Sequence, residues 1–201
     1  MISQAALANH MQWMFDTFHF GQFGHSGGND RILQKTPFVF DASVWEFWAP
    51  LLSGGTLVVA EPEMHKDPAY LARIIREDNI TAVQFVPSLL EAFLQVDGVE
   101  HCRSLQKVFC GGEPLAPALV NLFHQKLPGR QLVNLYGPTE ATIDSSFALC
   151  PPGSDRVTIG RPITNVSYLI LDQHLNLLPV GVPGELYIGG RGLARGYLNQ
   201  P

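Results

Sequence analysis

The chain has 201 residues, of which 46% are hydrophobic and 15% are charged, so it can bury a core and is not disordered in composition. Its formal net charge is −5 with no basic block, which argues against nucleic acid or an anionic membrane surface as the main partner. No apolar run reaches membrane-spanning length, no Lys or Arg precedes the first apolar stretch, and the three cysteines lack metal-ligand spacing. A cytoplasmic protein is therefore expected.

The first elements along the chain are a helix and a glycine-rich loop. Residues 3–18 carry apolar positions at helical spacing. The stretch GQFGHSGGND, residues 21–30, has four glycines and allows a phosphate cradle, but no Lys-Ser/Thr pair follows it. The missing pair favours a surface loop.

Strand-like and helix-like segments then alternate as far as residue 136. Asp41 or Ser43 is expected to cap the first of these helices, and Gly54 to end it. The alternation predicts an α/β fold with a parallel sheet, right-handed crossovers and flanking helices. The predicted strands are 31–40, 56–60, 80–86, 105–110 and 130–136, and the predicted helices are 41–55, 67–78, 88–95 and 116–127.

After residue 150 the pattern changes to short strands separated by Gly/Pro turns. The segments 166–172, 176–184 and 184–190 are each typical of a strand in an antiparallel or barrel-like part. We therefore expect an α/β part over residues 1–150 and the start of a β-barrel-like part over residues 151–201.

Ligands bind outside the carboxyl ends of strands in an open parallel sheet, and one such end carries NLYGPTEAT, residues 134–142. A hydroxyl at Thr139 and a carboxylate at Glu140 suit a phosphate and its Mg²⁺ ion. Tyr136 has an aromatic face for a base, and Asn134 has the donor and acceptor of an adenine-binding group. A solvent-exposed turn is the alternative explanation.

Two further strand ends carry candidate residues. Gly111 and Gly112 allow a ligand to approach the backbone closely, or they form a tight turn into the next helix. Asp41 follows an apolar strand, where its carboxylate either caps the following helix or anchors a cationic group.

The stretches FDASVWEFWAPLL, NLYGPTEAT and GELYIGGRGLARGYLNQP together resemble core motifs of the amino-acid-activating adenylation domains of nonribosomal peptide synthetases, in that family's order. The resemblance covers essentially the whole chain. It implies ATP-dependent formation of an aminoacyl adenylate with release of pyrophosphate. The acyl group is then transferred to the phosphopantetheine thiol of a peptidyl carrier domain, in a chain that also contains a condensation domain.

The resemblance also assigns roles to the nucleotide-binding and catalytic positions. Asn134 and Tyr136 would hold the adenine. Thr139 would contact the α-phosphate, and Glu140 would bind magnesium. Gly137 would turn the chain toward the phosphates. The resemblance places Gly112 at the nucleotide too, and it pairs Asp41 with the α-ammonium group of the amino acid.

The family's amino-acid pocket maps onto nine positions. Trp45 and Phe109 would form its floor, and Gln84 and Asp144 would be its two polar groups for a substrate side chain. A side-chain amide satisfies both polar groups, so glutamine is expected, with glutamate second. The nine positions are Asp41, Ala42, Trp45, Gln84, Phe109, Gly111, Leu135, Ile143 and Asp144.

Compared with the family, the chain lacks a phosphate loop with its Lys, the Thr-Gly-Asp motif and the C-terminal subdomain with a second Lys. It is therefore expected to be an internal fragment that is inactive alone. Two alternatives remain: an acyl- or aryl-CoA ligase of the same superfamily, for which Asp41 has no ammonium partner, and a degenerate non-catalytic remnant.

Overall fold

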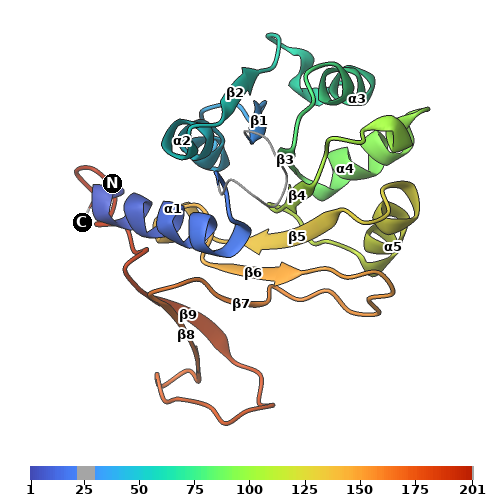
Figure 1. Cartoon of the computed structure of the whole chain (residues 1–201). Coiled ribbons are helices and arrows are strands. Elements are labelled where there is room, and N and C mark those ends of the chain that lie inside the picture. The colour runs from blue at the N-terminus through green and yellow to red at the C-terminus, as the bar shows by residue number, and fades with distance from the viewer. Residues whose placement is uncertain (22–29, 201) are drawn as a thin grey trace.

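The computed structural model describes residues 1–21 and 30–200 (Figure 1). The possible phosphate cradle predicted within residues 21–30 lies almost entirely outside these described residues. A seven-stranded sheet forms the centre, with the strand order β2-β1-β3-β4-β5-β6-β7. Helices cover both of its faces, which confirms the predicted α/β class.

The first five strands of the central sheet are parallel to one another. Strand β6 pairs antiparallel with β5, and β7 pairs antiparallel with β6. The parallel strands are β1 (Arg31–Gln34), β2 (Thr56–Val59), β3 (Ala82–Phe85), β4 (Lys107–Cys110) and β5 (Gln131–Tyr136). Strands β6 (Ser146–Leu149) and β7 (Arg161–Pro162) were not predicted from the sequence. Strand β7 shows that the large sheet continues past residue 150.

Among the described residues, five α-helices cover this sheet: α1 (Gln4–Phe18), α2 (Ala42–Ser53), α3 (Pro68–Glu77), α4 (Pro87–Leu94) and α5 (Pro117–Lys126). The Ser3 hydroxyl caps α1 by accepting from the Ala6 N–H, and Gly54 ends α2 in the left-handed region as predicted. Helices α3, α4 and α5 begin with a proline, whose missing N–H costs nothing in the first turn.

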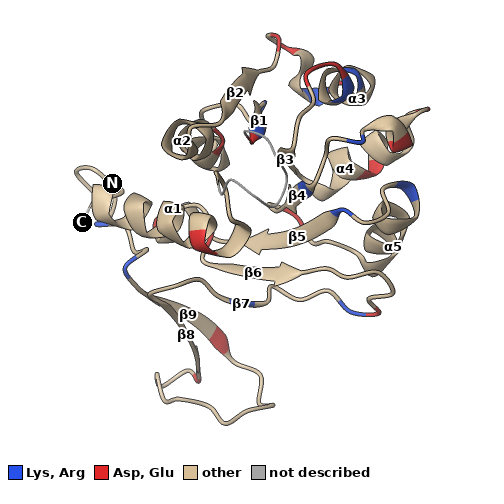
Figure 2. Ribbon diagram, viewed as in Figure 1, with Lys and Arg blue, Asp and Glu red and all other residues tan. Residues whose placement is uncertain are grey.

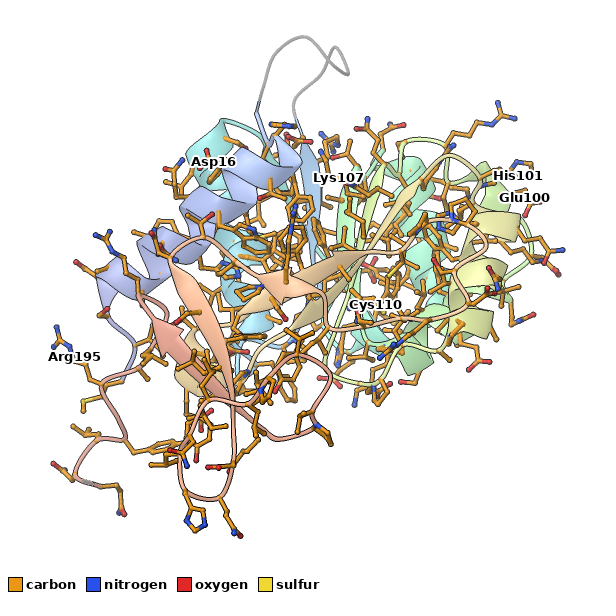
Figure 3. All side chains as sticks on the ribbon, turned by 90° about the horizontal axis from the view of Figure 1, so that it is seen from below. Asp16, Glu100, His101, Lys107, Cys110 and Arg195 are labelled. Carbon is orange, nitrogen blue, oxygen red and sulfur yellow. The ribbon has the colours of Figure 1, made fainter. Side chains whose placement is uncertain are left out.

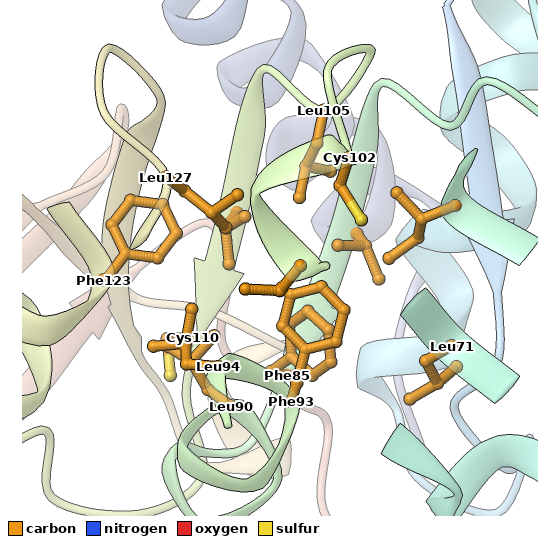
Figure 4. Packing of buried hydrophobic residues seen from close by; sticks show 14 of the residues in the cluster. Leu71, Phe85, Leu90, Phe93, Leu94, Cys102, Leu105, Cys110, Phe123 and Leu127 are labelled. Carbon is orange, nitrogen blue, oxygen red and sulfur yellow. The ribbon is translucent and has the colours of Figure 1, made fainter. Parts of the chain in front are cut away.

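The sheet separates two hydrophobic cores. Phe85, Phe93 and Phe123 belong to the core between the sheet and helices α3, α4 and α5, which Figure 4 shows from close by. Trp45 and Phe109 belong to the core under α1 and α2, where their ring centroids lie 5.0 Å apart in a T-shaped arrangement. Alternation along β3 and β4 sends successive side chains into opposite cores, so the site residues on these strands face a fixed side.

The predicted strand 31–40 was too long, because β1 ends at Gln34 and a turn leads into α2. The fully buried carboxylate of Glu46 on α2 accepts hydrogen bonds from the backbone N–H groups of Lys35 and Thr36. These N–H groups therefore bond to a side chain and not to a neighbouring strand. Strand β2 is only partly buried because it lies at the sheet edge.

The chain after β7 forms a separate two-stranded antiparallel sheet of β8 (Val166–Leu171) and β9 (Glu185–Gly190), which projects away from the central sheet in Figure 1. The predicted strand 176–184 was wrong, since this segment contributes only one isolated bridge, from Leu177 to Leu171. The barrel-like character of this part and its boundary at residue 151 stay predictions.

Figure 2 shows the positions of charged residues scattered along the ribbon. Figure 3 shows Asp16, Glu100, His101 and Arg195 toward the outside of the ribbon and Cys110 among the strands.

Within residues 1–21 and 30–200, no helix has the length and apolar character needed to cross a bilayer.

Candidate active site

Two cavities lie at the edge of the central sheet where the parallel strands β3, β4 and β5 end. The first has a volume of about 310 Å³ and the second about 450 Å³. Gly112, Leu135 and Gly137 line both, so the cavities adjoin. The ends of β4 and β5 meet here as the strand-end rule predicts, and Asp41 reaches the first cavity from the turn before α2.

Most of the predicted amino-acid-binding residues line the first cavity. Trp45 and Phe109 do not line it and are fully buried in the core behind it. They support the cavity wall and do not form a floor exposed to the cavity. The predicted residues that line it are Asp41, Ala42, Gln84, Gly111, Leu135, Ile143 and Asp144.

Gln84 on β3 has a fixed orientation. The Trp45 indole Nε1–H donates a hydrogen bond to the Gln84 side chain, and an indole N–H can only donate. The group that faces Trp45 is therefore the Gln84 carbonyl oxygen Oε1. Its amide Nε2 makes no hydrogen bond with any described residue and is left to donate to a ligand in the cavity.

Asp144 has a partner that the sequence did not reveal. His10 on α1 lies 134 positions earlier, and its Nε2 is 3.1 Å from the Asp144 Oδ2 atom. Both side chains are buried. No periodicity or motif connects the two positions, so sequence patterns carry no signal for this pair.

Asp41 occupies the position before α2, but neither Asp41 nor Ser43 caps this helix with its side chain. The Ser43 hydroxyl donates to the Phe40 carbonyl oxygen at 2.8 Å. The Asp41 Oδ2 atom is buried and has no hydrogen-bond partner among the described residues. Of the two predicted explanations for Asp41, helix capping is wrong, and a cation anchor stays a prediction.

Four of the residues predicted to bind the nucleotide line the second cavity: Gly112, Asn134, Tyr136 and Gly137. The Asn134 amide Nδ2 donates to the Thr158 carbonyl oxygen at 2.9 Å, which fixes the amide on one wall. Gly137 has to be glycine, since an added Cβ would lie 2.4 Å from the Ile143 carbonyl oxygen.

Thr139 and Glu140 are exposed in the 3-10 turn Thr139–Ala141, which lines neither cavity. A segment from the C-terminal part holds this turn: the Ala194 N–H donates to the Glu140 carbonyl oxygen at 2.8 Å, and the Tyr197 hydroxyl donates to the Glu140 carboxylate. The described residues contain no group of three or more His, Cys, Asp or Glu side chains placed to hold a metal ion.

Changing Tyr197 to phenylalanine is expected to raise the pKa of the Glu140 carboxyl group. The Tyr197 hydroxyl stabilises the ionised carboxylate, and this hydrogen bond is the main cause of the lowered Glu140 pKa. With the lowered pKa, the hydrogen bond stabilises the fold above the ordinary glutamate pKa, and this effect is lost as the pH falls through the folded-state pKa. A carboxyl ¹³C NMR titration of the 201-residue chain measures the change.

Tyr187→Phe is the matched control, since the Tyr187 hydroxyl approaches a different exposed carboxylate, that of Glu185. The control should leave the Glu140 titration unchanged. Equal Glu140 titration curves for the original chain and the Tyr197→Phe variant would contradict the assigned contact.

Sequence reasoning also missed several residues of the first cavity. Lys35 follows directly after β1, so the strand-end rule applied to this strand would have found it. Burial lowers the Lys35 pKa, while the Glu46 charge partly opposes the shift. The missed lining residues are Lys35, Thr36, Pro37, Phe40, His65, Lys66, Phe85, Val86 and Leu89.

The chain is similar in sequence to segments of two much longer synthases. It is 51% identical to tyrocidine synthase 3 of Brevibacillus parabrevis over 199 residues, which is 98% of this chain and 3% of that protein. It is 41% identical to indigoidine synthase of Dickeya dadantii over 205 residues, covering 100% of this chain and 13% of that protein. The chain thus spans a small part of the length of the curated relatives it matches.

The chain also superposes on solved structures of nonribosomal peptide synthetases. The nonribosomal peptide synthetase FmoA3 bound to AMPPNP superposes with a TM-score of 0.89 at 29% identity, over 100% of this chain and 22% of that one. A four-domain nonribosomal peptide synthetase, holo-AB3403, bound to AMP and glycine, matches with a TM-score of 0.86 at 31% identity, over 98% and 14%.

The model of the family described as AMP-binding enzyme matches residues 1–198, nearly the whole length of the chain. The motifs, the α/β fold and the relatives agree with this match. The chain therefore belongs to the AMP-binding enzyme family and resembles the adenylation domains of nonribosomal peptide synthetases.

Proposed function

We propose that the chain supplies the amino-acid pocket and part of the nucleotide site of an amino-acid-activating adenylation domain. The substrate carboxylate attacks the α-phosphorus of ATP, the bond to the β-phosphate breaks, and pyrophosphate leaves. The phosphopantetheine thiol of a carrier domain then loses its proton and attacks the acyl carbon of the aminoacyl adenylate, the acyl–phosphate bond breaks, and AMP leaves. This chemistry requires mainly positioning and charge stabilisation.

The observation that carries the proposal is the unpartnered carboxylate oxygen of Asp41 beside the first cavity. A buried anionic oxygen without a partner is costly, and the α-ammonium group of an amino acid would satisfy it. An acyl- or aryl-CoA ligase, the alternative function, has a substrate without this ammonium group. The Asp41 environment therefore favours an amino acid.

The proposed substrate is L-glutamine, with L-glutamate second. Gln84 keeps its Nε2 amide as a donor, and Asp144 keeps its Oδ1 oxygen as an acceptor, because their other polar atoms pair with Trp45 and His10. The glutamine carboxamide has a matching carbonyl oxygen and amide N–H. A glutamate carboxylate accepts from Gln84 but places a second negative charge against Asp144.

The second cavity is the proposed adenosine site, with Asn134 toward the base edge and Tyr136 toward its face. The exposed carboxylate of Glu140 fits one hard oxygen ligand of a Mg²⁺ ion, which usually keeps several waters and binds substrate phosphates. The magnesium ion would supply charge neutralisation at the phosphates. We place Thr139 at the α-phosphate, beside Glu140.

The partners that this function requires are a peptidyl carrier domain and a condensation domain, and the proposed compartment is the cytoplasm. The relatives are much longer than this chain, which leaves room for such domains in those proteins. The isolated 201-residue chain is expected to show little or no adenylation activity.

The test is amino-acid-dependent ATP–pyrophosphate exchange in a hybrid, in which residues 1–201 replace the matching segment of the adenylation domain of tyrocidine synthase 3. Exchange led by glutamine supports both the activity and the substrate. Exchange led by another amino acid keeps the activity and overturns the substrate. No exchange in a folded hybrid contradicts the proposed function and favours a degenerate remnant, and exchange by the isolated chain overturns its expected inactivity.

A further inference from the structure

We propose that His10 is a specificity-determining positioning residue, which holds the Asp144 carboxylate in one orientation so that the pocket selects a side chain with an N–H donor. The inference rests on the proposed function. It adds a residue of α1, outside the nine mapped pocket positions, to the residues that decide between a carboxamide and a carboxylate substrate.

The contact is built into the core. His10 is 1% exposed, and its Nε2 atom lies 3.1 Å from Asp144 Oδ2. The ring also contacts Trp13 on the same helix, with centroids 5.4 Å apart at an interplanar angle of 67°. Trp13 packs in turn against Phe18 and Phe147, so the imidazole has little room to turn.

The ring nitrogens of His10 have different surroundings, and this difference identifies the tautomer. Nδ1 is buried and has no hydrogen-bond partner among the described residues. A proton on Nδ1 would be a buried N–H without an acceptor, which is costly. The proton therefore sits on Nε2 and is donated to Asp144, and the ring stays neutral because a second proton would have to reside on Nδ1.

A neutral donor has a specific consequence for the cavity. It satisfies one oxygen of Asp144 without cancelling the carboxylate charge, so the remaining oxygen stays a charged acceptor. Gln84, whose orientation Trp45 fixes, offers its Nε2 amide to the substrate side chain as a hydrogen-bond donor. A substrate side chain must then accept from one group and donate to the other. Glutamine does both, whereas glutamate brings like charges together.

The experiment compares kcat/KM for glutamine and for glutamate in the hybrid adenylation domain described above. His10→Phe removes the N–H donor and leaves the Asp144 carboxylate free to rotate. The ratio of the two kcat/KM values is expected to fall about tenfold or more, the size of one hydrogen bond to a charged group. His10→Gln places an amide N–H near the position of Nε2 and should restore most of the ratio.

His124→Phe is the matched control. The His124 ring nitrogen also pairs with an oxygen, the carbonyl of Cys150, but His124 lies on α5 and lines neither cavity. This variant should leave the glutamine-to-glutamate ratio unchanged even if it lowers stability.

An unchanged ratio in an active His10→Phe variant overturns the inference, and so does a His10→Gln variant as unselective as His10→Phe. Absence of exchange with every amino acid in the unmodified hybrid would instead be a failure of the proposed function. A ¹⁵N NMR spectrum of histidine-labelled chain gives a readout that needs no activity and no variant. Protonated Nε2 with bare Nδ1 supports the inference, and the other tautomer or a doubly protonated ring overturns it.

Discussion

Replacing Asp41 with alanine in the hybrid adenylation domain is expected to lower kcat/KM for the amino acid by roughly 10²-fold to 4 × 10³-fold. Removing one partner of a buried charge pair typically costs about 3–5 kcal/mol, which corresponds to a loss of that size. Asp41→Asn should also be severe, because a neutral amide keeps the shape but not the charge. The measurement is amino-acid-dependent pyrophosphate exchange over a range of substrate concentrations.

A glutamine analogue without the α-amino group distinguishes an ammonium anchor from a structural role. This analogue has no cation for Asp41, so Asp41→Ala should leave its weak turnover unchanged or raise it. Asp16→Asn is the matched control, since Asp16 is exposed on α1, accepts from Gln12, and lines neither cavity. Equal losses for glutamine and the deaminated analogue in Asp41→Ala would contradict the proposed role of Asp41.

Local patterns were sufficient to predict the α/β class and most helices and parallel strands. Period-two and helical hydrophobic patterns arise within a few residues, so α3 and β5 are visible in the sequence itself. Strand β6 is only four residues long, and β7 has two residues, one of which is Pro162. Neither segment has enough residues for a clear alternating pattern, so the sequence carries no signal for these strands.

The family resemblance was sufficient to name Asp41, Gln84 and Asp144, which three separate segments bring to one cavity. The contacts that orient these side chains were not predicted from the sequence. The atoms that remain available to a ligand depend on Trp45 and His10, which approach from two different helices. Hydrogen-bond partners of this kind follow from packing geometry and not from residue spacing.

Trp45→Ala is expected to destabilise the isolated 201-residue chain by about 3–5 kcal/mol, the usual cost of deleting a large aromatic side chain from a core. Trp45 is 0% exposed and packs against Phe109 and Phe20. Trp48→Ala is the matched control on the same helix, and because Trp48 is 43% exposed it should cost less than about half as much. Urea denaturation followed by circular dichroism measures both changes.

Trp45→Phe separates the two roles of Trp45, because it keeps an aromatic ring in the core but removes the indole N–H. The free energy of unfolding should fall by about 1–3 kcal/mol, less than in Trp45→Ala, since the Gln84 carbonyl oxygen loses its donor and a smaller ring occupies the space.

In the hybrid, the freed Gln84 amide of the Trp45→Phe variant can turn its oxygen toward the cavity and present a second acceptor beside Asp144. The advantage of glutamine over glutamate should persist, while kcat/KM for glutamine falls, because no donor then faces the substrate carbonyl oxygen. Unchanged kcat/KM for glutamine in a destabilised Trp45→Phe variant would show that Trp45 contributes packing alone and that the orientation of Gln84 does not depend on it.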